Sequence, residues 1–393
     1  MKPLYLDYNA TTPLDPSVLE AMLPHLQEHY GNPSSIHQLG RQARSFLDEY
    51  RYRMADWWQC KPSEVVFTGG GTESNNLAVF GTARLRKPKG RHLICSAIEH
   101  HAVLHAYQHL EEKEGFEVSY CPVEPTGRVD PDHLRSLIRP ETQLVSVMAA
   151  NNETGTLQPV AEIGRLCRDH GVLFHTDAVQ WFGKEPVEHI HQFEADLVTV
   201  CGHKCHGPKG AGALFIRSPL LPEKILFGGA HENERRAGTE NVAGIAGLVQ
   251  ALEMHARTPV FRASPIEQAT LTCRRILESL EGVTLLSPES GSLVNTLTFT
   301  VENADSIGLL AALDLEGICA TSGSACSVGS LEPSHVALAM GASREEANAM
   351  VRFSFGREND LEQVAFMAER LPDILSRCQR THKSANSLSL IHI

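Results

Sequence analysis

The feature that most constrains the fold of this chain is a regular alternation of short apolar runs with stretches of helical pattern. Because strands separated by helices usually pair in parallel, and because these runs are apolar on both faces, they predict a mostly parallel sheet with helices on both sides. The expected strands are 63–68, 92–96, 116–123, 142–150, 172–179, 196–201 and 212–217.

Helix boundaries in this first part of the chain carry recognisable signals. The glycines of GGGTES (69–74) precede a helix expected to run through Asn75 to Leu85. Asp130 can cap the next helix with its side-chain oxygen, and Pro131 at the first helical position is a second signal of a helix start. A further helix is expected from Pro159 to His170, with a glycine directly after it.

The rhythm changes after about residue 250, where the pattern predicts a smaller α+β domain. A long helical pattern covers 241–281, and the stretch from residue 382 onward has no clear pattern and is expected to be a loose tail. We therefore expect a large α/β domain over 15–255 and a small domain built from 1–14 and 256–393. The other expected elements of the small domain are strands at 292–301 and 350–356 and a helix near 305–316.

Composition narrows the function classes. The chain has 393 residues, 42% hydrophobic and 21% charged, with a formal net charge of −12. An acidic balance argues against nucleic acid as the main partner. No apolar run approaches the roughly 20 residues of a membrane span, and the N-terminal stretch lacks the apolar core of a signal peptide. We expect a cytoplasmic protein whose ten cysteines are reduced thiols.

Three features between residues 69 and 206 carry candidate chemistry. The loop GGGTES can bind a phosphate through its backbone N–H groups, with Thr72 as an added donor, or it can be a tight turn. Asp177 stands at the end of an apolar strand, with Gln180 three residues further on. Lys204 follows the next strand, and consecutive strand ends can lie side by side. A lysine at a partly dry strand end is a candidate nucleophile.

A Schiff-base lysine, a carboxylate for a ring nitrogen and a phosphate loop are together the parts needed to bind pyridoxal 5′-phosphate. The alternative for CGHKCHGPKG (201–210) is a zinc site, since Cys201, His203, Cys205 and His206 are zinc-type ligands. Zinc is less favoured, because no second Cys/His pair complements this one.

A second candidate centre is ATSGSACSVGS (320–330), where Cys326 lies in a run of small residues. Such a segment has little to bury, so we expect Cys326 to be the most exposed of the ten thiols. At an ordinary pKa of about 8.5, only a few per cent of it would be thiolate at neutral pH. The alternative is an ordinary loop cysteine.

These stretches, taken in order, resemble the cysteine desulfurases of the NifS/IscS group, which are related to class-V aminotransferases. The resemblance covers nearly the whole chain and implies a pyridoxal-phosphate enzyme of fold type I. The matching segments are YLDYNATTPLD, YGNPSSIH (30–37), FTGGGTESNN, AIEHHAV (97–103), NNETGTLQP (151–159), FHTDAVQ, CGHKCHGPKG, RRAGTEN (235–241), SGSACSVGSLEPSHV (322–336) and VRFSFGR (351–357).

The resemblance implies roles for five residues around the coenzyme ring. Lys204 would form the Schiff base, Asp177 would pair with the ring nitrogen and His100 would stack on the ring and shuttle protons. Gln180 and Asn152 would hydrogen-bond the ring hydroxyl and the bound substrate.

The resemblance also implies a phosphate site, a substrate site and a second subunit. Thr239 would reach the phosphate from the partner of a homodimer, and Arg352 would bind the substrate carboxylate with its planar fork. Position 201 is cysteine where many relatives carry serine, so a phosphate contact there would use its backbone N–H. The residues expected around the phosphate are Gly71, Thr72, Cys201 and His203.

The activity implied is removal of sulfur from L-cysteine, which leaves L-alanine and a persulfide on Cys326. The expected acceptor is an iron–sulfur scaffold protein, nitrogenase maturation included, and Cys326 is also a candidate transient ligand of an iron–sulfur cluster. The alternatives are an aminotransferase or a selenocysteine lyase of the same fold, and a zinc protein built on residues 201–206.

Overall fold

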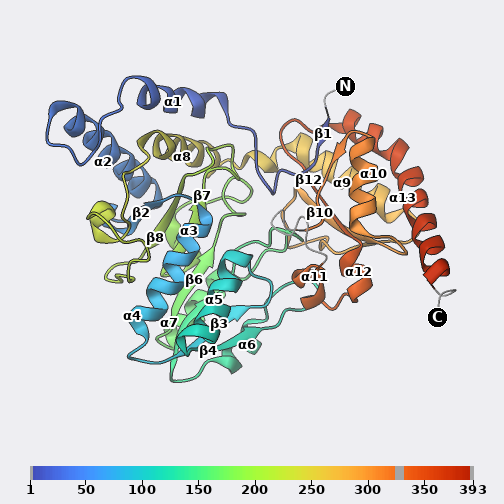
Figure 1. Cartoon of the computed structure of the whole chain (residues 1–393), viewed down its shortest axis with the longest axis horizontal. Coiled ribbons are helices and arrows are strands. Elements are labelled where there is room, and N and C mark those ends of the chain that lie inside the picture. The colour runs from blue at the N-terminus through green and yellow to red at the C-terminus, as the bar shows by residue number, and fades with distance from the viewer. Residues whose placement is uncertain (1–2, 324–331, 390–393) are drawn as a thin grey trace.

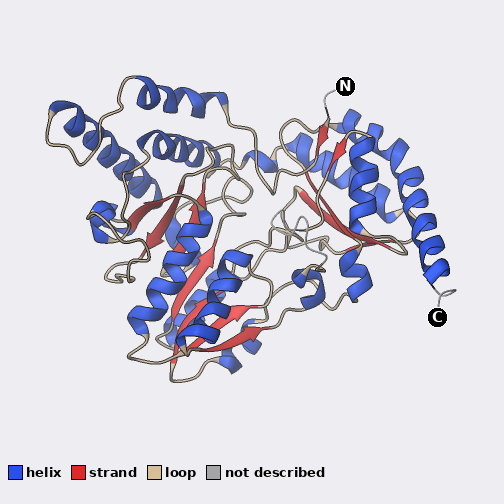
Figure 2. Cartoon of the chain, in the orientation of Figure 1, coloured by secondary structure: helices blue, strands red, loops and turns tan. Residues whose placement is uncertain are grey.

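The computed structural model of the chain describes residues 3–323 and 332–389. A large seven-stranded sheet and a smaller three-stranded sheet lie side by side along the long axis (Figure 1). Helices pack against both sheets, as the blue and red ribbons of Figure 2 show. Within the described residues, no helix combines the length and the apolar character that a membrane crossing requires.

The large sheet is mixed, with strand order β2-β8-β7-β6-β5-β3-β4. Four neighbouring pairs are parallel, and β8 is antiparallel to both of its neighbours. Every strand expected before residue 250 is present, and the expected mostly parallel sheet is confirmed. The strands are β2 (Val65–Thr68), β3 (His92–Ser96), β4 (Glu117–Cys121), β5 (Thr142–Ser146), β6 (Leu173–Asp177), β7 (Leu197–Cys201) and β8 (Gly212–Ile216).

The sheet is covered on both faces because neighbouring strand residues point to opposite sides. Val65 and Phe67 join one buried cluster, and Val66 between them joins another. The helices on the Val66 side are α3 (Gly71–Asn76), η2 (Leu77–Gly81), α4 (Thr82–Arg86) and α5 (His101–Glu114). Those on the Val65 side are α2 (Gln38–Trp58), α6 (Pro131–Leu137), α7 (Val160–Asp169) and α8 (Val242–His255).

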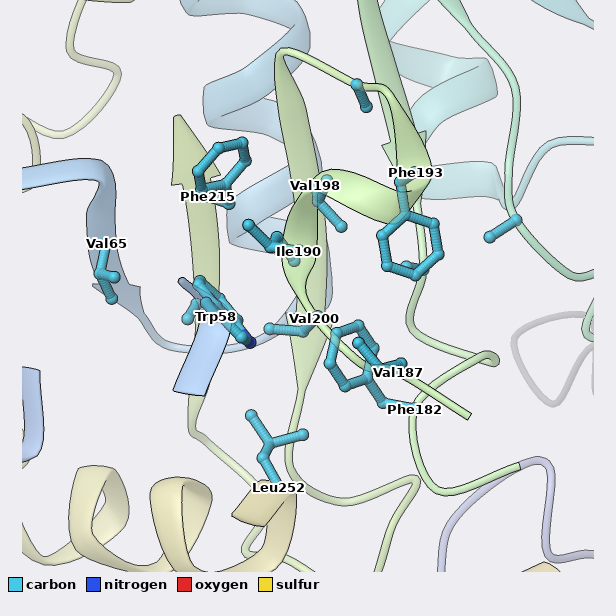
Figure 3. Packing of buried hydrophobic residues seen from close by; sticks show 14 of the residues in the cluster. Trp58, Val65, Phe182, Val187, Ile190, Phe193, Val198, Val200, Phe215 and Leu252 are labelled. Atoms are coloured by element: carbon cyan, nitrogen blue, oxygen red, sulfur yellow. The ribbon is translucent and has the colours of Figure 1, made fainter. Parts of the chain in front are cut away.

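Aromatic side chains fasten the segment that follows β6 to this core (Figure 3). The rings of Phe182 and Phe193 stack with centroids 6.1 Å apart, and Trp58 meets Phe215 edge to face at 6.4 Å. The ring centroids of Trp58 and Phe182 are 6.5 Å apart. Because aromatic pairs add about 0.5–1.5 kcal/mol each beyond the area they bury, the turn through Phe182 is held firmly.

The smaller sheet has the order β12-β10-β9 and is antiparallel throughout. Its buried cluster joins Leu4 and Leu6 with side chains from between residues 266 and 375. The N-terminal strand β1 (Leu4–Tyr5) pairs in parallel with β11 (Ile318–Cys319). The other elements are β9 (Val283–Leu285), β10 (Thr296–Val301), β12 (Met350–Ser354), α9 (Ser264–Glu278), α10 (Ser306–Leu315), α11 (His335–Ala339), α12 (Arg344–Asn348) and α13 (Leu361–Ser389).

Two expectations about helices were wrong. The pattern over 241–281 is two helices, α8 and α9, separated by a stretch that contains Pro259 and the short helix η5 (Val260–Arg262). A proline lacks an N–H donor and disfavours the helical conformation of the residue before it, which explains the break. The stretch after residue 382 is no loose tail at its start, because α13 continues to Ser389. The division of the chain at residues 15 and 255 stays a prediction.

One long helical pair near the start was not expected. Helix α1 (Pro16–Gln27) begins with Asp15, whose Oδ1 accepts the N–H of Ser17 at 2.9 Å. Both α1 and α2 lie against α8. The signal was available in the sequence, because Asp15 followed by Pro16 is a typical helix start.

Candidate active site

The ends of β6 and β7 bring Asp177 and Lys204 to one edge of the large sheet. Strands β6 and β7 are parallel neighbours, with Asp177 opposite Thr199. Lys204 follows β7 by three residues, in the turn after Cys201. The expectation that these two consecutive strand ends lie side by side is therefore confirmed.

The Lys204 amine is held by two main-chain carbonyls of the N-terminal segment. Its Nζ donates to the oxygens of Asn9 at 2.7 Å and Ala10 at 2.8 Å. Burial lowers the pKa of Lys204, Arg352 lowers it further, and Cys201 and the nearby carboxylates raise it. A lysine with a lowered pKa has more of the neutral amine that can act as a nucleophile or a base.

The Asp177 carboxylate is buried and satisfied by two donors. Its Oδ2 accepts from Nδ2 of Asn75 at 2.7 Å, and its Oδ1 accepts from the N–H of Val179 at 2.9 Å. Burial raises the pKa of Asp177, whereas these two hydrogen bonds and the charge of Lys204 oppose the rise. A positively charged ring N–H would be a natural partner for such a carboxylate.

Two histidines near Lys204 are neutral at physiological pH. His100 is the N-cap of α5, where its Nδ1 accepts the N–H of Ala102 at 3.1 Å. Burial and the charge of Lys204 lower the pKa of His100 to about 4. His203 lies 3.2 Å from the Thr11 hydroxyl, and the same two causes lower its pKa to about 4.

The glycine-rich loop after β2 lies against the turns that follow β6 and β7. A Cβ added to Gly71 would lie 2.9 Å from Cγ2 of Val179 and 3.9 Å from Cβ of Cys201, so only glycine permits this approach. Gly71 also begins α3, whose first N–H groups have no acceptor within the helix. Thr72 is exposed in the first turn. The arrangement suits an anion in front of the helix terminus, which favours the phosphate interpretation over a plain turn.

Gln180 and Asn152 meet at the N-terminal segment. Nε2 of Gln180 donates to the main-chain oxygen of Asn9 at 2.9 Å. The main-chain oxygen of Asn152 accepts from Nδ2 of Asn9 at 3.2 Å and from Arg352 at 2.6 Å. Both residues expected at the ring and the substrate therefore contact one residue, Asn9.

Arg352, on β12, reaches the same site from the smaller sheet. Its guanidinium is buried and donates to Oδ1 of Asp7 at 2.8 Å as well as to the Asn152 carbonyl. Each of its two terminal nitrogens thus donates one hydrogen bond within the protein. Its Nε has no hydrogen-bond partner among the described residues, and each of the two terminal nitrogens has a second N–H, so several donors remain for an incoming carboxylate.

Thr239 and Cys326 are the two remaining expected residues. Thr239 is exposed, between η4 (His231–Glu234) and α8. Cys326 lies outside the described residues. Of the residues that flank that stretch, Ser334 donates to Oε2 of Glu153 at 2.5 Å. A Cβ added to Gly323 would lie 2.8 Å from the same oxygen, so Glu153 lies close to both flanks.

The zinc alternative lacks a ligand set. Across residues 3–323 and 332–389, no group of three or more His, Cys, Asp or Glu side chains is arranged to hold a metal ion. The Cys205 thiol instead approaches the main-chain oxygen of Gly202 at 3.3 Å. Nδ1 of His206 lies 2.9 Å from the oxygen of Pro13.

Sequence reasoning missed the residues that organise the site. Asn9 and Asp7 stand in the segment YLDYNATTPLD, and Asn75 follows the glycine loop, but no role could be read from their positions. Lys184 gave no signal, since a lysine after a turn is ordinarily exposed. In the structure it is fully buried beside Gln180.

The residues present fit pyridoxal 5′-phosphate. The donor set contains a buried amine with a lowered pKa and, on the neighbouring strand end, a buried carboxylate. The close approach of Gly71 to Val179 and Cys201 places a helix N-terminus beside them. An aldehyde, a ring nitrogen and a phosphate would each find a group of suitable chemistry.

Comparisons with known proteins find similarity over nearly the whole chain. The family model described as aminotransferase class-V matches residues 4–367. A protein of Dictyoglomus turgidum named cysteine desulfurase IscS is 42% identical over 95% of both chains. One of the same name from Methanosarcina thermophila is 42% identical over 96% of this chain and 93% of its own. A solved structure titled NifS-like protein has a TM-score of 0.88 and 35% identity, covering 95% of this chain and 99% of that chain.

Proposed function

Because the chain belongs to the class-V aminotransferase family and, within it, to the cysteine desulfurases, we propose how its own residues divide the work of that reaction. The protein is a pyridoxal-phosphate-dependent cysteine desulfurase that takes sulfur from L-cysteine for iron–sulfur cluster assembly. The observation that carries the assignment of its centre is the buried Lys204 amine beside the buried Asp177 carboxylate.

Five side chains hold the coenzyme in this proposal. When bound, pyridoxal phosphate supplies an aldehyde for the amino group and a ring that accepts electrons from the substrate carbon. Lys204 binds the aldehyde, and Asp177 keeps a proton on the ring nitrogen. His100 stacks on the ring, and Gln180 and Asn152 contact the ring hydroxyl and the substrate.

The phosphate lies at the start of α3 in this proposal. The close packing of Gly71 against Val179 leaves the backbone N–H groups of the first turn directed at it. The Cys201 thiol is a weak donor, so its contribution comes from its backbone N–H. The contacting residues are Gly71, Thr72, Cys201 and His203.

Lys204 and His100 handle protons. Because burial lowers the pKa of Lys204, its Nζ can take the proton from the α-carbon of the substrate. Nδ1 of His100 accepts the Ala102 N–H, so the ring proton resides on Nε2, where it can be passed on. The low pKa of His100 keeps its ring uncharged, which suits a ring that would stack on the coenzyme.

Arg352 binds the substrate carboxylate. The Asp7 carboxylate and the Asn152 carbonyl hold two of its nitrogens, which fixes the plane of the guanidinium before the substrate arrives. The N–H groups that these contacts leave over, on Nε and on the two terminal nitrogens, can then bind the carboxylate with little further loss of rotamer freedom. This orients the substrate sulfur for transfer.

Cys326 is the nucleophile. Its thiolate attacks the sulfur of L-cysteine, the bond between that sulfur and the β-carbon breaks, and the carbon fragment leaves as L-alanine. Thiol plus L-cysteine gives persulfide plus L-alanine, so atoms and electrons balance without an external reductant. The persulfide sulfur then passes to an acceptor thiol on an iron–sulfur scaffold protein.

We also propose that the working form is a cytoplasmic homodimer in which Thr239 reaches the partner's phosphate site. Large apolar side chains are exposed beside α1 and α2 and in the segment after β8, which supports a covered face there. Ile36 is 90% exposed and Phe227 is 80% exposed. Other exposed members are Tyr30, Tyr52 and Leu221.

The proposal is tested with purified protein and L-cysteine. We expect a yellow protein that releases alanine in the absence of a keto acid, and sulfide when a reductant is present. Borohydride reduction followed by peptide mapping should find the coenzyme on Lys204, and Lys204→Ala should lose both the linkage and turnover. Amino transfer to a keto acid without sulfide would select an aminotransferase. Activity on selenocysteine but not on L-cysteine would select a selenocysteine lyase.

A further inference from the structure

Lys184 is a fully buried lysine that lies beside the proposed coenzyme residues and has no part in the mechanism above. It is 1% exposed, and its Nζ donates to Oδ1 of Asn9 at 2.6 Å and to Oε1 of Gln180. Nζ also lies 5.4 Å from the centre of the Phe261 ring. Lysines are almost never fully buried unless they are paired, because removing the amine from water is costly. A buried lysine at this place is therefore a candidate for a functional role.

The turn that carries Lys184 is built to bring it inward. Gly183 has a φ of +79°, and a Cβ added there would lie 2.7 Å from Cβ of Cys205, the residue after Lys204. Only glycine therefore allows the turn to pack against the Lys204 segment. Phe182, directly before the glycine, is fixed in the aromatic cluster of Figure 3.

Lys184 and the Asn9 main-chain oxygen together determine how the Gln180 amide is oriented. Lys184 donates to this amide, as an ammonium must and as a neutral amine can, so the atom of Gln180 that faces it is the carbonyl oxygen. The amide nitrogen then donates one hydrogen to the oxygen of Asn9, at 2.9 Å, and its second hydrogen remains for a ligand. Without Lys184 only the Asn9 oxygen would still oppose a half-turn of the amide, so the orientation that presents a donor to the ligand would be held less firmly.

Asn9 connects the same contacts to Lys204. Its main-chain oxygen accepts from both Gln180 and Lys204, and its side chain accepts from Lys184. Burial and the charge of Lys204 keep the pKa of Lys184 well below its usual value. A neutral amine still has two N–H donors for the two amide oxygens, so the arrangement does not require a charged Lys184.

We propose that Lys184 is a positioning residue that acts through Gln180: its buried amine fixes the Gln180 amide so that an N–H, and not the carbonyl oxygen, faces the coenzyme. The inference rests on the proposed place of Gln180 at the ring hydroxyl. Lys184 itself contacts neither coenzyme nor substrate in this proposal. Asn9 connects Lys184 to Lys204, because it accepts a hydrogen bond from each of them.

The test is a double-mutant cycle on the affinity for pyridoxal phosphate, measured by titrating the apoprotein and following absorbance. We expect Lys184→Met to raise Kd about three- to tenfold, the net effect of one lost hydrogen bond. In a Gln180→Ala background, the same change should alter Kd by less than about twofold. The control is Lys113→Met, at a side chain 66% exposed, which should leave Kd unchanged.

Two results would overturn the inference. Equal effects of Lys184→Met in both backgrounds would show a general structural role, and so would a lower melting temperature with an unchanged Kd. If Lys184→Met does not fold, Lys184→Gln serves in the same cycle, because it keeps N–H donors on a shorter side chain. The expected pattern is the same, with a smaller rise in Kd.

Peptide mapping separates this inference from the function on which it depends. Borohydride-reduced wild-type protein with the coenzyme on Lys204 and additive effects in the cycle would reject the inference alone. Coenzyme on Lys184 would reject both the inference and the proposed site. In wild-type and variant holoenzymes we also expect kcat to fall with Lys184→Met while KM for L-cysteine, set by Arg352, changes by less than about twofold.

Discussion

Replacing Asn75 by leucine removes the side-chain donor from the buried Asp177 carboxylate with little change in volume. The bond is 2.7 Å long and charge-assisted, and the only other donor to this carboxylate among the described residues is the N–H of Val179. Hydrogen bonds to charged groups contribute about 1.5–3 kcal/mol to stability. We therefore expect Asn75→Leu to destabilise the apoprotein by that amount at neutral pH.

The pH dependence of this loss follows from the direction of the pKa shift. Burial raises the pKa of Asp177 and the Asn75 donor opposes the rise, so removing the donor raises the pKa further. A raised carboxyl pKa costs stability as the pH climbs from the unfolded-state value to the folded-state value, and the cost persists above it. Because the variant has the higher Asp177 pKa, its loss of unfolding free energy relative to the wild type is largest at high pH. The loss becomes smaller as the pH falls and Asp177 is protonated.

The assay is urea unfolding of apoprotein at several pH values, with the neighbouring Asn76→Leu as the control. Asn76 also donates two hydrogen bonds, but to the main-chain oxygens of Thr72 and Ala102. Its loss should cost roughly 1 kcal/mol per bond at every pH. A deficit for Asn75→Leu that stays constant with pH would refute the view that Asn75 stabilises the ionised carboxylate. In holoenzyme, kcat should fall roughly tenfold or more, since each 1.4 kcal/mol is a factor of ten.

Three further outcomes follow from the structure. Cys326→Ala should abolish release of sulfide and alanine yet keep the yellow colour, and retained turnover would remove Cys326 from the mechanism. Arg352→Lys should raise KM for L-cysteine roughly tenfold or more, because an ammonium cannot bind Asp7, the Asn152 carbonyl and a carboxylate in one plane. A fall in kcat with KM unchanged would contradict this prediction. Burial lowers the pKa of His175 to about 3. Between this value and the ordinary pKa of about 6.5, the unfolded chain binds a proton at His175 that the folded chain does not. The free energy of unfolding should therefore fall by up to about 5 kcal/mol as the pH drops from about 6.5 toward 3. His175→Gln should flatten this dependence of melting temperature on pH, and an unchanged slope would assign acid sensitivity to other groups.

The sequence was sufficient to predict the large sheet, because its information is local. Each strand is an apolar run of a few residues, and the order of strands and helices limits how they can pair. The neighbourhood of Asp177 and Lys204 followed from the same rule, since both stand at the ends of consecutive parallel strands. The cap at Asp130 was also correct, with its Oδ1 accepting the Asp132 N–H at 2.9 Å.

The organisation of the site could not be predicted, because it depends on contacts between residues far apart in the chain. Arg352 is paired with Asp7, 345 positions away, and Lys184 with Asn9, 175 positions away. No periodicity links such positions. The contacts of Arg352 with Asp7 and with the Asn152 carbonyl could not be foreseen for this reason, and its place at the substrate carboxylate stays a prediction.

The N-terminal segment has a consequence for the order in which the molecule can be completed. Asn9 donates its backbone N–H to the Ser354 hydroxyl at 3.0 Å, and Leu4 lies opposite Ile318 in a two-stranded ladder. A ribosome releases the first of these partners more than three hundred residues before the last, so the growing chain must keep its beginning unpaired until nearly all of it has emerged. The pair of carbonyls that holds Lys204, on Asn9 and Ala10, can thus form its final contacts only after Ser354 has emerged, and a nascent chain should gain its coenzyme only after that point.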